Sequence, residues 1–241
     1  GGGRGDLALA VVEHSPRCSM IMVDVNAAAL QSAQVEAEQR GVAERITFLN
    51  VAWGTTVPAE VSEAVAALQT QGVPVILIGL HACGGLSDAL LQACAVHGWS
   101  FCCCPCCFAS NERLRDWRPL HADRADGSWT VANALLTELG ALAESVRTVH
   151  QSDAMHLVNA IRCQLCVTCS QESAGVFPPE LSNLLVLARR LGLVAGEDLT
   201  AQTEPKPEHA RRHHDWGIRM VEFPRDWSGR NMIITGRAPL R

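Results

Sequence analysis

The chain has 241 residues, 48% of them hydrophobic and 19% charged, so it can bury a sizeable core and is not expected to be disordered. Its formal net charge of −5 gives no overall attraction to nucleic acid or to an anionic membrane. The sequence has no run of about eighteen apolar residues and no signal-peptide pattern at GGGRGDLALA, so we expect no membrane partner.

Alternating helices and strands are expected over the first half of the chain. In order, they are a glycine-rich turn and short helix in 1–15, a strand in 19–26, a helix in 27–41, a strand in 45–53, a helix in 58–72, a strand in 73–84, a helix in 85–98 and a strand in 99–107. The apolar run VPVILIGL within 73–84 is continuous, which predicts a strand buried on both faces. The alternation predicts an α/β fold with a parallel, doubly wound sheet.

The second half of the chain is expected to be mostly helical before it ends in strands. Helical patterns occupy residues 128 to about 169 and 178–192, and a polar, proline-containing stretch at 195–215 reads as a loop. Residues 217–238 contain two strand-like runs around the turn RDWSGRN, which predicts an antiparallel hairpin. We expect a single domain over 1–241, with a helical insertion at about 112–195.

Cysteine use indicates the compartment. Eleven cysteines without a secretory signal favour reduced thiols and an intracellular, cytoplasmic location, although a nucleus or an organelle also fits. Five of the cysteines lie in SFCCCPCCF, residues 100–108. Adjacent residues on a strand point to opposite faces, so Cys102, Cys103 and Cys104 cannot pair with their neighbours, and we expect them to be buried core thiols.

The turn GGGRGDLA has the pattern of a cofactor-binding loop. Gly3, Gly5 and Ala8 satisfy the dinucleotide pattern G-x-G-x-x-A, whereas Gly1, Gly3 and Gly5 satisfy the G-x-G-x-G of S-adenosylmethionine enzymes. Asp24 follows about twenty residues later at a predicted strand end, where an acid can hold both ribose hydroxyls of a nucleoside. Both NAD and S-adenosylmethionine fit these residues.

The motif GLHACGGLSDALLQAC followed by CCPCCFASN resembles a branch of class I methyltransferases that includes the tRNA acceptor-stem 2′-O-methyltransferases. The matching residues are His81, Cys83, Gly84 and Asp88, with the pair Cys106 and Cys107. The resemblance extends from residue 1 to about 111 and includes the final hairpin. It implies a Rossmann-like sheet with helices on both faces, an antiparallel last strand, S-adenosylmethionine as cofactor, and RNA, specifically tRNA, rather than DNA as substrate.

The same resemblance implies which residues bind the cofactor. These are Gly1, Gly3, Gly5, Asp24 and His81, together with Asn50 and Trp53. The last two are included because Ala52 stands where many relatives carry the acid that contacts adenine. Relatives also carry histidine where this chain has Phe108. A strand precedes the glycine turn in this family, and we expect the sheet of this chain to lack it.

Four residues are catalytic candidates. His81, at a predicted strand end, can accept a proton from a hydroxyl or nitrogen acceptor. The dipeptide Pro105-Cys106 is similar to the nucleophile motif of cytosine-C5 methyltransferases, which makes Cys106 a candidate for covalent catalysis with Cys83 as its helper. Cys107 is a candidate because, like Cys106, it lies just past Pro105, where we expect the chain to turn over the cofactor crevice. A structural role for His81 stays equally open.

No metal site is expected. Cys163, Cys166 and Cys169 form C-x-x-C-x-x-C, but on a helix each three-residue step turns by about 300°, so the outer thiols diverge by about 120°. The stretch also fits a helix whose core face carries Ala154, Leu157, Ile161 and Leu165. Two further functions stay open: an NAD-dependent oxidoreductase, and a degenerate methyltransferase fold that binds proteins.

Overall fold

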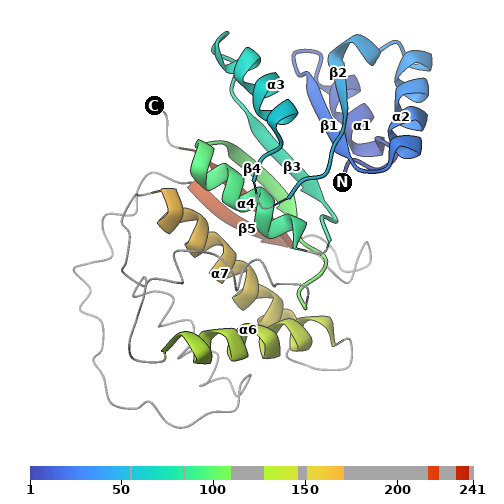
Figure 1. The fold of residues 1–241 in the computed structure, drawn as a ribbon. Helices are drawn as coiled ribbons and strands as arrows, with labels where there is room; N and C mark the ends of the chain where they lie inside the picture. Colours follow the sequence, from blue (N-terminus) through green and yellow to red (C-terminus); the bar gives the residue numbers. More distant parts are fainter. Residues whose placement is uncertain are drawn as a thin grey trace. The chain divides into compact units, whose positions relative to one another are not determined.

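The computed structural model describes residues 1–54, 56–83, 85–109, 128–145, 151–170, 217–222 and 232–238. The chain divides into two compact units: a first unit, Gly1–Val75, and a second unit, Ile76–Arg241 (Figure 1). The predicted helix in 178–192 and the loop in 195–215 lie outside the described residues. The single domain over 1–241 stays a prediction.

The first unit is a two-stranded parallel sheet with helices. Its elements are α1 (Asp6–His14), β1 (Met20–Asp24), α2 (Ala27–Gln39), the short 3-10 helix η1 (Ala43–Arg45), β2 (Ile46–Asn50) and α3 (Ala59–Gln69). Helix α2 begins where the Asn26 side chain accepts a hydrogen bond from the Ala29 amide, a typical N-cap. The apolar faces of α1, β1 and α2 enclose a core that includes Leu9, Val12, Met22 and Leu30. This packing places the end of β1 beside the glycine turn.

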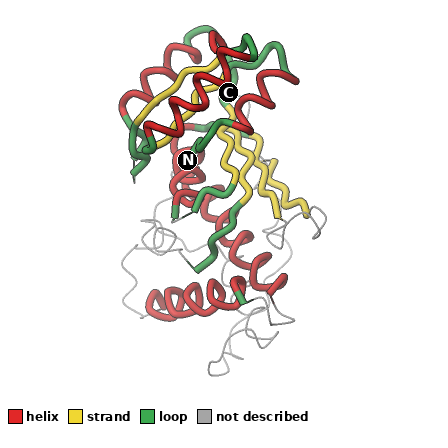
Figure 2. Tube along the Cα trace, turned by 90° about the vertical axis from the view of Figure 1, so that its right-hand side faces the viewer, coloured by secondary structure: helices red, strands yellow, loops and turns green. Residues whose placement is uncertain are grey.

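The second unit is a four-stranded mixed sheet with helices. Its elements are β3 (Ile76–Leu80), α4 (Leu86–His97), β4 (Ser100–Cys104), α6 (Ser128–Glu144), α7 (Gln151–Ser170), β5 (Gly217–Glu222) and β6 (Met232–Arg237). The strand order is β3-β4-β6-β5, and the four strands lie side by side in Figure 2. Strands β3 and β4 are parallel, while β6 is antiparallel to both of its neighbours.

This topology confirms the predicted α/β fold class. The pairs β1–β2 and β3–β4 are parallel, and the predicted terminal hairpin forms from β5 and β6. The last strand, β6, is inserted between β4 and β5, which is consistent with the Rossmann-like sheet that the resemblance implies. Among the described helices, none combines the length and apolarity that a membrane crossing needs.

One expectation about β3 is wrong. The continuous apolar run predicted burial on both faces, yet Ile76 is 61% exposed and Leu80 48% exposed. In the described sheet, β3 is an edge strand that pairs only with β4. Residues at the two ends of an edge strand have a neighbouring strand on one side only, so their side chains are less covered.

The cysteines of β4 are core residues in large part. Cys103 is 1% exposed and Cys104 4% exposed, as predicted, whereas Cys102, which shares its face of the strand with Cys104, is half-buried. Burial raises the pKa of the Cys103 thiol to about 12, an effect that a hydrogen bond to Ser87 only partly offsets. Cys103 is therefore a protonated, inert packing residue at neutral pH.

Cys103 is expected to resist alkylation of the folded protein. A maleimide reacts with the thiolate, and Cys103 offers neither thiolate nor access at neutral pH. Time-resolved labelling followed by peptide mass spectrometry measures this against Cys18, which is exposed in the first unit. Labelling of both thiols at the same rate before unfolding would contradict the burial of Cys103.

Candidate functional site

The glycine turn lies directly against the end of β1. The amino group of Gly1 and the amide of Gly2 both donate to the carbonyl oxygen of Val23, at 3.0 and 2.8 Å. The next amide, that of Gly3, donates to the Asp24 carboxylate at 2.7 Å. The turn and the acid, which lie about twenty residues apart in the sequence, therefore form one hydrogen-bonded unit.

Gly5 closes the turn and caps α1. Its φ of 85° is in the left-handed region that side chains rarely adopt. A Cβ at this position would lie 2.8 Å from the Cβ of Ala33 on α2, which is closer than van der Waals contact allows. Glycine is needed here both for the backbone angle and for the close approach of the turn to α2.

The Gly5→Ala substitution is expected to destabilise the first unit by more than the same change at Gly41. Gly41 also has a positive φ, 67°, but a Cβ there would meet nothing within 4 Å, so it carries only the backbone strain of about 1–2 kcal/mol. The clash with Ala33 adds about 1–3 kcal/mol of overpacking at position 5. Denaturant unfolding of the two variants measures the difference, and equal losses would show that the clash relaxes without cost.

Asp24 is half-buried and already oriented by the backbone. One carboxylate oxygen accepts from the Gly3 amide and the other from the Asn26 amide at 2.8 Å. Burial acts to raise the pKa of Asp24, but the hydrogen bonds from Asn26 and Gly3 outweigh it and hold the pKa below the ordinary 3.8. The backbone hydrogen bond from Val25 also lowers this pKa, and an ionised carboxylate has about four acceptor positions, so it can still accept from a ligand hydroxyl.

Asn50 and Trp53 follow the next strand. The side-chain amide of Asn50 donates to the backbone carbonyl of Asp24 at 3.0 Å, and the two residues are paired across β1 and β2. Asn50 therefore reaches the same strand edge as Asp24, and its role in cofactor binding stays a prediction. Trp53 is half-buried in the segment after β2, and Ala52 beside it is exposed.

A second group of candidate residues lies in the second unit, where β3 and β4 end. The Sγ atoms of Cys83 and Cys106 are 2.9 Å apart, and those of Cys106 and Cys107 are 3.6 Å apart. All three thiols lie within 4.8 Å of one another. We refer to Cys83, Cys106 and Cys107 as the thiol cluster.

His81 marks the turn that leads to the thiol cluster. It has a φ of 54°, and among the described residues no other non-glycine has a positive φ. Its amide donates to the carbonyl of Cys104 at 3.2 Å, which continues the pairing of β3 and β4 for one residue, and its side chain is exposed. A left-handed non-glycine residue is uncommon and often found at functional turns.

The loop after β4 is held by α6. One carboxylate oxygen of Glu144 accepts from the amides of both Phe108 and Ala109, each at 2.7 Å. Phe108 is fully buried, so the residue that stands in place of the relatives' histidine packs in the core. Cys106 and Cys107 are therefore placed by a fixed loop.

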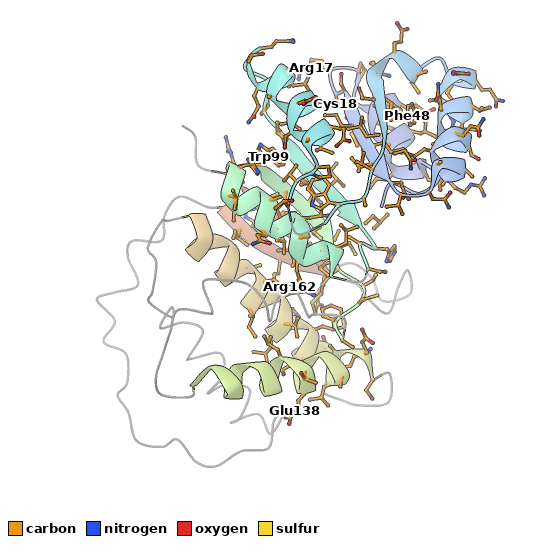
Figure 3. The ribbon with its side chains drawn as sticks, viewed as in Figure 1. Arg17, Cys18, Phe48, Trp99, Glu138 and Arg162 are labelled. Atoms are coloured by element: carbon orange, nitrogen blue, oxygen red, sulfur yellow. The ribbon has the colours of Figure 1, made fainter. Side chains whose placement is uncertain are left out.

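A buried ion pair, which the sequence analysis did not find, supports this loop from α7. Arg162, which is labelled in Figure 3, donates through Nε to an Asp88 carboxylate oxygen at 2.6 Å, and both side chains are 1% exposed. The guanidinium also lies 5.4 Å from the ring centroid of Phe108 and donates to the Asn159 side chain at 3.2 Å. One signal was available: Arg162 follows Val158 by four residues on the apolar face of α7.

The apolar face itself was predicted correctly in part. Ala154, Leu157 and Ile161 are buried on α7, as expected. The side chains of Leu165, Cys166 and Cys169 lie outside the described residues, so the C-x-x-C-x-x-C motif stays without a structural description. Gly84 of the H-x-C-G motif is also outside the described residues.

The structure thus brings the predicted site residues together in two sets. Gly1, Gly3, Asp24 and Asn50 form one in the first unit, while His81 and the thiol cluster end the strands of the second. Burial and the hydrogen bonds with Cys83 and Cys107 raise the pKa of Cys106 above its ordinary value. A neutral Cys106 thiol does not favour the thiolate nucleophile that covalent catalysis requires.

Comparisons with known proteins match part of the chain. One curated relative, the Glutathione S-transferase C-terminal domain-containing protein homolog of Drosophila melanogaster, is 28% identical over 112 residues. The alignment covers 46% of this chain and 17% of that protein. No solved structure matches the chain. Residues 1–112, which carry both the glycine turn and the thiol cluster, match the family described as "Methyltransferase domain", and this match supports a methyltransferase family for the chain.

Proposed function

We propose that this chain is an S-adenosylmethionine-dependent methyltransferase. The observation that carries the proposal is the Asp24 carboxylate at the end of β1, which the Gly3 amide orients at 2.7 Å and whose pKa is held below its ordinary value by backbone hydrogen bonds. A ribose offers two neighbouring hydroxyl donors, and an acid at the end of this strand is placed to accept from them. The match of residues 1–112 to a methyltransferase family favours S-adenosylmethionine over NAD as the nucleoside.

Methyl transfer from S-adenosylmethionine needs little covalent chemistry from the protein. S-adenosylmethionine supplies a methyl group on a sulfonium, a good leaving group, so the protein contributes mainly by holding donor and acceptor in line. The glycine turn, Asp24 and Asn50 would orient the nucleoside in the first unit. His81, exposed at the end of β3, is the candidate base for the acceptor proton.

RNA, and tRNA in particular, is the acceptor we propose. This rests on the resemblance of His81, Cys83, Asp88, Cys106 and Cys107 to the acceptor-stem 2′-O-methyltransferase branch. A hydroxyl acceptor is consistent with an imidazole base, because the proton must leave as the methyl group is transferred.

Calorimetry with S-adenosylhomocysteine tests the cofactor proposal on the full-length protein. We expect saturable binding of S-adenosylhomocysteine and no binding of NAD at the same concentrations. Affinity for NAD without affinity for S-adenosylhomocysteine would overturn the proposal in favour of an oxidoreductase.

A transfer assay tests the acceptor. Full-length protein with methyl-labelled S-adenosylmethionine is incubated separately with total RNA, protein extract and small-molecule extract, and we expect label in the tRNA fraction. Label only in another fraction would contradict RNA as the acceptor. No label in any fraction would favour a degenerate fold that binds proteins.

A further inference from the structure

The thiol cluster brings three metal-ligating side chains from two different strand ends to one place. Cys83 follows β3, while Cys106 and Cys107 follow β4, and the three Sγ atoms lie within 4.8 Å of one another. Cys83 is exposed, and Cys106 and Cys107 are half-buried, so an ion from solvent can reach all three. A disulfide joins only two thiols, so disulfide formation alone does not account for three converging cysteines.

The backbone on the Cys83 side of the cluster is held in place. The amide of Leu86 donates to the Cys83 carbonyl at 3.1 Å, and the Ala82 carbonyl accepts from both the amide and the hydroxyl of Ser87, at 3.2 and 2.8 Å. Ala82 and Ser87 are buried, which limits movement of the turn. Cys83 therefore has little backbone freedom to lose on binding a ligand.

The Cys106 side is held as firmly. Pro105, which is buried, fixes one backbone angle directly before Cys106. Directly after Cys107, the amides of Phe108 and Ala109 are both bound by Glu144. A site whose ligands are supported by surrounding hydrogen bonds binds its ion more tightly than one whose ligands must first be ordered.

We propose that Cys83, Cys106 and Cys107 bind one zinc ion through their three thiolates. With zinc–sulfur bonds of about 2.3 Å, two thiolates on a tetrahedral ion lie about 3.8 Å apart. The Cys106–Cys107 separation of 3.6 Å is already close to this value, and the 2.9 Å between Cys83 and Cys106 requires the two thiols to move apart by about 1 Å. Rotation of the exposed Cys83 side chain supplies that movement.

Binding releases the three thiol protons to solvent and leaves a fourth tetrahedral position for a water molecule or another exogenous ligand. The ion cross-links the turn after β3 to the loop after β4. This site differs from the C-x-x-C-x-x-C motif of α7, because two of its ligands are adjacent in sequence and the third comes from another strand end. It does not depend on methyl transfer.

Metal analysis of the full-length protein, purified with a thiol reductant and dialysed against trace zinc, tests the proposal. We expect one equivalent of zinc per chain and, after replacement by cobalt, the near-ultraviolet absorption of thiolate-to-cobalt charge transfer. Each of Cys83→Ser, Cys106→Ser and Cys107→Ser should weaken zinc binding by at least about tenfold. Cys18→Ser, which removes an exposed thiol of the first unit, is the matched control and should leave zinc binding unchanged.

Two results would overturn the zinc site. One is zinc binding that persists in the triple Cys83→Ser, Cys106→Ser, Cys107→Ser variant, which would place the metal elsewhere. The other is a reduced protein that takes up no zinc or cobalt, including the case in which Cys83 and Cys106 are recovered as a disulfide. Calorimetry with S-adenosylhomocysteine on the same samples separates a failure of this site from a failure of the cofactor proposal.

Discussion

The Asp88→Leu substitution is expected to lower the free energy of unfolding of the second unit by about 3–5 kcal/mol. Asp88 and Arg162 are each 1% exposed and joined at 2.6 Å, so the substitution leaves the Arg162 guanidinium buried without its carboxylate. A buried charge that loses its partner retains its full desolvation cost. Denaturant unfolding followed by a signal from the second unit measures the loss.

Two further variants separate the charge from the packing. The double variant Asp88→Leu, Arg162→Met removes both charges and should recover most of the lost stability, because an apolar pair of similar volume carries no desolvation cost. Glu36→Gln breaks the exposed ion pair with Arg40 and should change unfolding little. A double variant no more stable than Asp88→Leu alone would show that shape, rather than charge, holds α4 against α7.

The Asp24→Asn substitution is expected to weaken binding of S-adenosylhomocysteine by about 10- to 150-fold. Hydrogen bonds to a charged group contribute about 1.5–3 kcal/mol, and the substitution removes the charge that two ribose hydroxyls would face. Calorimetry on the full-length variant measures the change. Glu44→Gln, which alters an exposed acid of η1 in the same unit, should leave the affinity unchanged.

The Asp24 carboxylate also makes the stability of the folded protein depend on pH. Because the folded-state pKa of Asp24 lies below 3.8, the carboxylate is ionised throughout the neutral range, and its contribution to stability is present above that value. The contribution is lost only as the pH falls through the lowered folded-state pKa.

An affinity of Asp24→Asn for S-adenosylhomocysteine equal to that of the natural sequence at neutral pH would contradict a role for this acid in cofactor binding.

Local pattern predicted the elements of this fold well. Gly41 follows the end of α2 and Pro58 precedes α3, as expected, because capping and backbone restriction act within a few residues. The terminal hairpin was also predicted from its turn and its two apolar runs. The burial of β3 was not, because a continuous apolar run does not reveal whether a strand has one neighbour or two.

The residues of the candidate site also fall into those that the sequence predicted and those that it did not. Gly3 and Asp24 were both predicted to bind the cofactor because the turn and the strand end have a recognised spacing. The hydrogen bond that joins them was found only in the structure. Arg162 was not predicted as a buried residue. An arginine on the apolar face of a helix can be recognised as half of an ion pair only once the carboxylate that pairs with it is known. That carboxylate, Asp88, is 74 residues away in the sequence.

The sequence by itself determined the element order, the α/β class, the glycine turn with its acid, and the residues at the ends of β3 and β4, because each depends on interactions within a turn, a strand or a known motif spacing. Only the tertiary structure decided that the thiols of Cys83, Cys106 and Cys107 converge within 4.8 Å, and that α6 and α7 hold the loop that carries two of them. The reason is physical: strand register and helix packing bring together residues that no local pattern relates.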